Sequence, residues 1–178
     1  MRRTLVLLAL ALFAVPLGAQ PPAPPARRNV LSVNPLGIPA GFYSADYERA
    51  LGANASGSVG VSYFSLHDEF DDEVSYLSSD LKLRYYPRAA LEGFSVGASA
   101  GLIRLGSDET TFDGQSTEES ESGVTVGTSL DYGWLLGDAR RVAVGLGAGL
   151  KRVLLFGGEA PDVTTFYPTI RVAVGYAF

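Results

Sequence analysis

Apolar residues alternate with small or polar residues along almost the whole chain after residue 28. The last stretch is the clearest case, because Ile170, Val172 and Val174 share one face while Arg171 lies on the other. A period of two residues is that of a β-strand, whose successive side chains point to opposite faces. No later stretch has the period of an amphipathic helix or the roughly 18 apolar residues of a helical membrane span. The chain is therefore expected to be all-β.

The alternating segments are long, and several exceed the roughly five or six residues usual in soluble sheets. They cover residues 29–36, 42–51, 56–66, 76–88, 93–106, 122–136, 142–156 and 165–178. Treating residues 35–41 as a turn gives an even number, which lets the first and last strands pair antiparallel. Short turns at 52–55, 89–93 and 137–140 alternate with longer polar loops at 67–75, 107–121 and 157–163. This layout predicts an eight-stranded, antiparallel, up-and-down transmembrane barrel over residues 29–178.

The first residues have the pattern of a secretory signal peptide. Arg2 and Arg3 precede the apolar run Leu5–Val15, which is too short for a helical span. Small residues follow, and cleavage is expected after Ala19, so that residues 1–19 are removed. Residues 20–28 contain four prolines and are expected to form a short extended leader.

Two features favour a barrel whose apolar face points outward into lipid. The polar face of the later strands is mostly Gly, Ala and Ser, which suits a narrow interior better than a solvated exterior. Aromatic residues also gather near strand ends, as expected at the level of lipid headgroups. One belt is expected to contain Tyr47, Tyr85, Trp134, Tyr176 and Phe178, and the other Phe42, Tyr63, Tyr76, Phe156 and Phe166.

The same polar face carries four acidic and four basic residues. They are Asp46, Glu48, Asp80 and Asp131 together with Lys82, Arg84, Lys151 and Arg171. An unpaired charge inside a barrel is costly, so these residues are expected to form a paired network that fills the lumen. Eight strands enclose a space that side chains just fill, which makes a packed interior the expectation and a narrow channel the alternative.

The C-terminal sequence Val172-x-Val174-x-Tyr176-x-Phe178 resembles the terminal signal of bacterial outer-membrane barrels. With the signal peptide and the alternation, the chain looks like a small barrel of the outer membrane protein A and X type. The resemblance implies a bacterial outer-membrane location, contact with membrane lipid and lipopolysaccharide, and recognition of the C-terminal strand by the assembly machinery. It does not indicate a partner for the loops.

The expected loops hold 13 of the 19 acidic residues and no lysine or arginine. Clustered carboxylates such as Asp68, Asp71 and Asp72 are the residues that could bind Ca²⁺ or bridge to lipopolysaccharide through divalent cations. Their spacing matches no EF-hand loop, and acidic runs are usually solvated surface, so no metal site is expected.

Ser65, His67 and Glu69 form the one constellation suited to nucleophilic catalysis. A family of eight-stranded lipid A deacylases uses Ser, His and Glu at a similar rim, although the order Ser-x-His here is the reverse of that family's His-x-Ser. The simpler interpretation is a loop histidine, and a lipid A-modifying hydrolase is the second alternative function.

Composition excludes several other classes of function. The chain has no cysteine and one histidine, which excludes cysteine-ligated metal centres and multi-histidine sites, and no cofactor is expected. A formal net charge of −5 lacks the basic field that nucleic acid binding requires. The sequence therefore predicts a non-enzymatic outer-membrane barrel with a structural or surface-interaction role.

Overall fold

The computed structural model describes residues 27–67, 73–110, 116–156 and 166–178. It contains eight strands and one short 3₁₀ helix, η1 (Ile38–Ala40). The strands are β1 (Asn29–Val33), β2 (Phe42–Ala50), β3 (Ala55–His67), β4 (Glu73–Tyr85), β5 (Gly93–Thr110), β6 (Ser116–Leu136), β7 (Val142–Phe156) and β8 (Phe166–Ala177). In the part of the chain that is described, no helix is long and apolar enough to cross a membrane.

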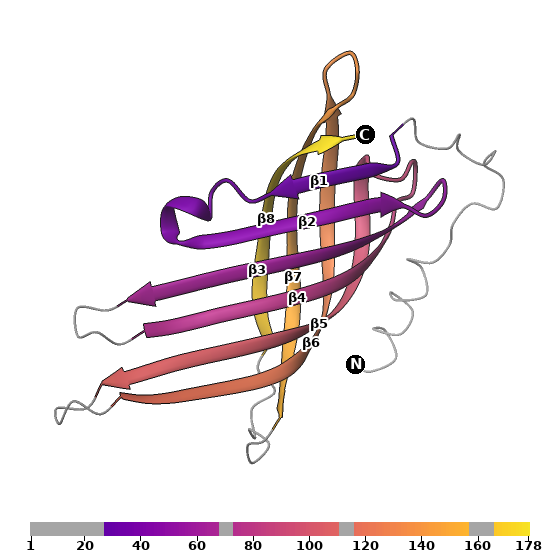
Figure 1. Cartoon of the computed structure of the whole chain (residues 1–178). Coiled ribbons are helices and arrows are strands. Elements are labelled where there is room, and N and C mark those ends of the chain that lie inside the picture. Colours follow the sequence, from indigo (N-terminus) through magenta and orange to yellow (C-terminus); the bar gives the residue numbers. More distant parts are fainter. Residues whose placement is uncertain (1–26, 68–72, 111–115, 157–165) are drawn as a thin grey trace, which may run out of the picture.

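Each strand pairs antiparallel with the next, and β1 pairs with β8, which closes the barrel (Figure 1). The predicted fold class, an eight-stranded antiparallel up-and-down barrel, is confirmed. The even number depends on the turn between β1 and β2. There the Asn34 side-chain oxygen accepts hydrogen bonds from the backbone N–H groups of Leu36 and Gly37, and Gly41 adopts a positive φ of 74°.

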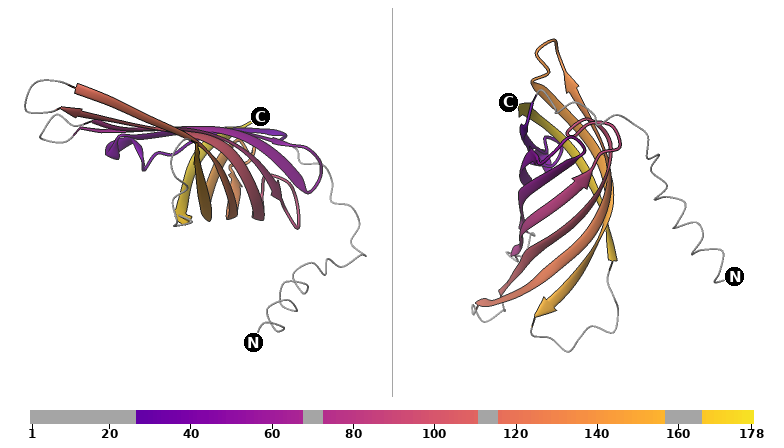
Figure 2. Two further views of the ribbon diagram at one scale, coloured as in Figure 1. Left: turned by 90° about the horizontal axis from the view of Figure 1, so that it is seen from below. Right: turned by 90° about the vertical axis from the view of Figure 1, so that its right-hand side faces the viewer.

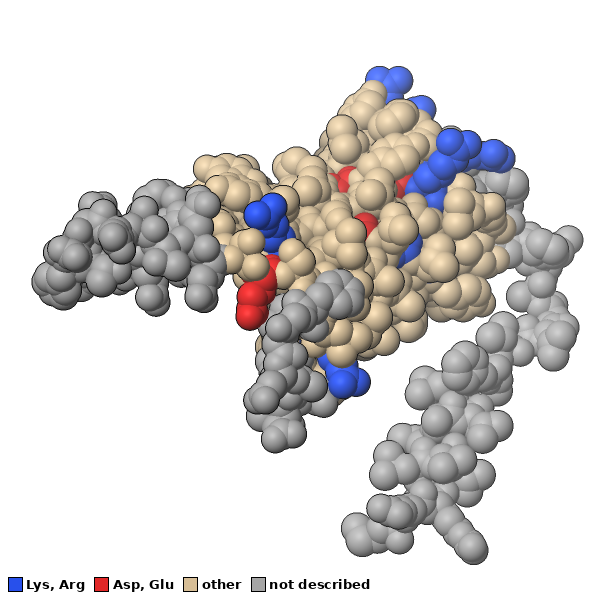
Figure 3. All heavy atoms as spheres, turned by 60° about the horizontal axis from the view of Figure 1, so that its bottom comes forward, with Lys and Arg blue, Asp and Glu red and all other residues tan. Residues whose placement is uncertain are grey.

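The side chains lie on the faces that the alternation predicts. Large apolar residues face outward and are exposed, with Leu81 67% and Ile170 83% exposed. Serine, threonine and charged residues such as Ser78, Thr125 and Asp131 are buried inside. Figure 3 shows one face of the molecule, on which residues other than Lys, Arg, Asp and Glu cover most of the described surface. Water-soluble barrels have the opposite arrangement, with apolar residues inside.

The prediction of a loop over residues 107–121 was wrong in its length. β5 continues to Thr110 and β6 begins at Ser116, so that this hairpin runs beyond the other strands (Figures 1 and 2). β4 likewise begins at Glu73, within the loop expected at 67–75. Polar side chains do not prevent pairing, because the ladder is made by backbone groups, and the register continues from Leu105↔Glu121 to Thr110↔Ser116.

The two ends of the barrel differ. We call one the turn end, because residues 51–54, 86–92 and 137–141 connect strands there, and Asn29 and Phe178 exchange backbone hydrogen bonds beside them. The other is the loop end, where residues 34–41, 68–72, 111–115 and 157–165 join the strands.

Candidate functional site

The turn end of the lumen is closed by small apolar side chains. Ala90 and Leu91, from the connection between β4 and β5, are 1% and 5% exposed. They pack in a buried cluster with Val30, Ala50, Tyr86, Ala143 and Ala177. Leu91 has a φ of 71°, which non-glycine residues rarely adopt. The backbone N–H of Ala90 donates to the carbonyl of Ala53, which holds the connection against the neighbouring turn.

Above this cluster, Arg84 and Glu48 form a charged layer across the lumen, which we call the floor. The Arg84 guanidinium lies 2.7 Å from the Glu48 carboxylate and 3.5 Å from that of Asp131. Glu48 also accepts hydrogen bonds from the hydroxyls of Ser56 and, at 2.6 Å, Tyr86. The Arg84 side chain is 2% exposed, so the floor has almost no contact with solvent. Strands β2, β4 and β6 are thereby linked through the interior.

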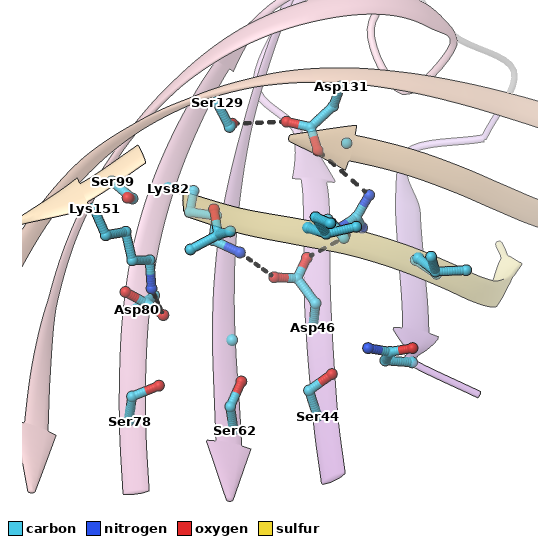
Figure 4. Close-up of a pocket in the computed structure, with 18 of the residues that line it drawn as sticks. Ser44, Asp46, Ser62, Ser78, Asp80, Lys82, Ser99, Ser129, Asp131 and Lys151 are labelled. Atoms are coloured by element: carbon cyan, nitrogen blue, oxygen red, sulfur yellow. Dashed lines mark hydrogen bonds and ion pairs between the residues drawn. The ribbon is translucent and has the colours of Figure 1, made fainter. Parts of the chain in front are cut away.

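The remaining lumen charges lie toward the loop end. Lys82 is 3.5 Å from Asp46, and Lys151 is 2.6 Å from Asp80. Arg171 lies between two acids, 4.0 Å from Asp46 and 3.9 Å from Asp131. The structure therefore brings all eight residues of the expected network inside the barrel, with each one in at least one ion pair. Figure 4 shows five of them, Asp46, Asp80, Lys82, Asp131 and Lys151, around the lumen.

Glycines make room for these side chains on the neighbouring strands. Asp46 pairs in register with Gly60, and Lys151 with Gly127. A Cβ atom built on Gly60 would lie 2.8 Å from the Asp46 carboxylate, and one on Gly127 would lie 2.8 Å from the Lys151 chain. Both distances are too short for a real contact, so the interior glycines are required by the charged residues beside them.

A cavity of about 620 Å³ occupies the lumen on the loop side of the floor. Three serines, Ser44, Ser62 and Ser78, are direct register partners across β2, β3 and β4 and lie in a row on one wall (Figure 4). Asp46 and Arg171 also line the cavity. The charges and hydroxyls that the sequence places inside the barrel therefore surround a space large enough for a small molecule.

The aromatic residues divide between the outer surface and the cavity. At the turn end, Tyr85, Trp134, Tyr176 and Phe178 are exposed on the outer face, and the Tyr47 hydroxyl donates to Asn29 at 2.8 Å. At the loop end, Tyr63 and Phe166 are exposed on the outer face. Phe42 and Tyr76, however, line the cavity, so their assignment to an outer belt was wrong. They share the inward parity of Asp46 and Asp80, and this parity decides which face they occupy.

The candidate catalytic residues lie at the loop end of β3. Ser65 and His67 are two residues apart on this strand, and Glu69 is outside the described residues. The hydrolase thus stays a prediction. The candidate metal residues Asp68, Asp71 and Asp72 also lie outside the described part, within which no group of three or more His, Cys, Asp or Glu residues could hold a metal ion.

Sequence reasoning missed two groups that belong to the floor. Tyr86 and Ser56 are buried and bind Glu48, yet neither is charged. Tyr86 lies two residues after Arg84, so the alternation places it on the inner face. The alternation does not show, however, that β4 ends at Tyr85. Its role as a cap over Glu48 requires knowledge of the register between β2, β3 and β4.

Comparisons with known proteins show the fold and no more. No protein-family model matches this chain, and no curated protein matches it. Among solved structures, it resembles the N-terminal β-barrel domain of Pseudomonas aeruginosa OprF, with a TM-score of 0.50 and 14% sequence identity. The likeness covers 85% of this chain and 98% of that domain. At this identity the resemblance concerns the architecture, an eight-stranded barrel.

Proposed function

We propose that this chain is a bacterial outer-membrane protein that spans the membrane as a closed barrel and has a structural or surface-interaction role. The observation that carries the proposal is the direction of the side chains. Large apolar residues are exposed around the outside, and paired charges are buried within. Each strand pairs with the next and β1 pairs with β8, so that most backbone groups of the strands have partners, as a β-structure in a bilayer requires.

Further support comes from two sequence patterns. The signal-peptide pattern of residues 1–19 would export the chain, and the alternating pattern Val172-x-Val174-x-Tyr176-x-Phe178 of β8 would be recognised by the outer-membrane assembly machinery. Outer-membrane lipid and lipopolysaccharide are the surroundings proposed for the apolar outer face. The acidic residues of the loop end, the exposed Glu121 among them, would then meet the outside medium.

The membrane location has a direct test. We expect the protein to leave the cell envelope only when detergent is added, and to run faster on a gel before boiling than after. The folded barrel stays compact in detergent, whereas the boiled chain is extended. Recovery from the periplasm in detergent-free buffer, with the same mobility before and after boiling, would show a soluble protein.

A narrow channel is the second candidate, favoured by the cavity that fills the loop side of the lumen. The floor of Glu48, Arg84 and Tyr86 and the cluster around Leu91 block the path to the turn end. We therefore expect a flat current trace for the protein in planar bilayers at high salt. Discrete, reproducible conductance steps would require the floor to open and would favour the channel.

A further inference from the structure

The strand pairing between β1 and β8 is incomplete toward the loop end. β1 pairs with β8 only from Val30↔Ala177 to Val33↔Val174. From Phe166 to Ala173, β8 therefore has a strand partner on the β7 side alone, and we call this open edge the seam (Figures 1 and 2). Pro168 lies within the seam and has no N–H to donate, which is typical of an edge strand.

An open edge is costly inside a bilayer. The backbone N–H and C=O groups of the seam have no water to bind in hydrocarbon, so they require another polar partner. The cavity is next to them, because Tyr167, Thr169 and Arg171 of β8 line it. Polar groups of a molecule bound in the cavity can therefore form hydrogen bonds with the backbone groups of this edge.

The lining of the cavity reaches the seam. It includes Asp46 and Arg171, which point inward, and also Val33 at the end of β1 and Ile170 and Val172 of β8. Val33 and Ile170 are exposed on the outer apolar face, so the cavity borders polar groups inside the barrel and apolar residues at the seam. A ligand that contacts both has a polar headgroup and an alkyl chain.

Four of the residues that line this cavity, Asp46, Ser78, Arg84 and Tyr167, have a buried polar atom with no hydrogen-bond partner among the described residues. Ser78 is 2% exposed, yet its hydroxyl has none, and neither does the buried Oδ1 of Asp46. The Arg171 guanidinium reaches its two acids only at 3.9 and 4.0 Å, beyond hydrogen-bond distance. The cavity lining therefore offers both donors and an acceptor, and the hydroxyl of a bound molecule can pair with either kind.

Charge balance points to a neutral headgroup. Lys82, Arg84, Lys151 and Arg171 are matched inside the barrel by Asp46, Glu48, Asp80 and Asp131. An added carboxylate or ammonium would leave one charge uncompensated in an enclosed space, which is unfavourable. Hydroxyl groups can bind Arg171, Asp46 and Ser78 without breaking the existing ion pairs.

We propose that this cavity binds a single-chain amphiphile with a neutral, hydroxylated headgroup, of the alkyl glycoside or monoacylglycerol class. The headgroup lies between Asp46, Ser78 and Arg171, and the alkyl chain leaves through the seam along Ile170 and Val172. The volume of about 620 Å³ is within the range of small-molecule pockets. This inference rests on the proposed membrane location, because the alkyl chain must emerge into lipid.

The test is native mass spectrometry of the folded full-length barrel in an ethylene glycol-based detergent, with octyl β-glucoside as the probe. We expect a saturable one-to-one adduct that survives removal of the micelle. Free glucose should bind at least tenfold more weakly, since each buried methylene strengthens binding by roughly fourfold. Equal binding of glucose and octyl glucoside would exclude a site that includes the seam.

Matched variants separate the cavity from the detergent belt. Ser78→Ala should weaken the adduct by roughly fivefold, the effect of one hydrogen bond. Ser95→Ala should leave it unchanged, because Ser95 is equally buried but lines the space on the other side of the floor. Ile170→Trp should block the chain's exit, whereas Leu81→Trp, on the outer face of β4, should not.

Several outcomes would overturn the proposal. They are the absence of a saturable adduct, equal effects of the two serine variants, or a persistent dimer in which a second copy closes the seam. Gel mobility before and after boiling is recorded on the same samples. A heat-modifiable protein without an adduct therefore contradicts the ligand site alone, while loss of heat-modifiability contradicts the membrane barrel itself.

Discussion

Replacement of Arg84 by methionine should lower the free energy of unfolding by about 3–5 kcal/mol. The substitution keeps the length and apolar stem of the side chain but removes the cation that faces Glu48 and Asp131. Both acids are buried, at 6% exposure each; Glu48 would be left as an uncompensated charge, and Asp131 would keep only Arg171, at 3.9 Å. Urea-induced unfolding in lipid vesicles measures the change, with Trp134, the only tryptophan, as the fluorescent probe.

Two controls make this result specific. Arg49→Met removes an arginine from an exposed position on β2 and should change stability by less than about 0.5 kcal/mol. Adding Glu48→Gln to Arg84→Met should restore part of the loss, because the double variant no longer buries the Glu48 charge. If Arg84→Met behaved like Arg49→Met, the floor would be hydrated, and the lumen would be more open than the ion-pair geometry indicates.

The sequence predicts which side chains face outward and which face inward better than it predicts where the strands end. A period of two residues decides which side chains share a face, so the outward position of Leu81 and the inward position of Asp80 follow directly. Strand ends depend on pairing instead. β5 and β6 continue through a polar stretch because each supplies the other's backbone partners, whereas β1 ends at Val33 where the Asn34 turn begins.

The sequence predicts which residues lie in the interior of the barrel, but not which of them contact one another. Parity places four acids and four bases inside, but it does not say that Arg171 of β8 lies between Asp46 of β2 and Asp131 of β6. Those contacts depend on register and barrel closure, which join residues far apart in the chain. The seam is also invisible in the sequence, since it follows from the short pairing of β1 with β8.

Replacement of Leu81 by arginine should be the substitution that best distinguishes a membrane barrel from a soluble one. Leu81 is 67% exposed on the outer face of β4, four residues from the end of the strand at Tyr85. In water, such an exposed position tolerates arginine with little effect. In a bilayer, the same charge lies within the apolar band and should lower the free energy of unfolding by about 2–4 kcal/mol.

Leu51→Arg is the matched control, because Leu51 is 63% exposed but lies in the turn that follows β2, at the turn end of the barrel. A charge there reaches headgroups and water, so the expected cost is about 0–1 kcal/mol. Urea titrations of both variants in the same vesicles give the comparison. Equal and small effects would mean that the outer face of β4 does not contact lipid. A larger loss of unfolding free energy for Leu81→Arg than for Leu51→Arg requires an apolar environment around β4. The difference between the two variants gives the cost of placing one charge in that environment.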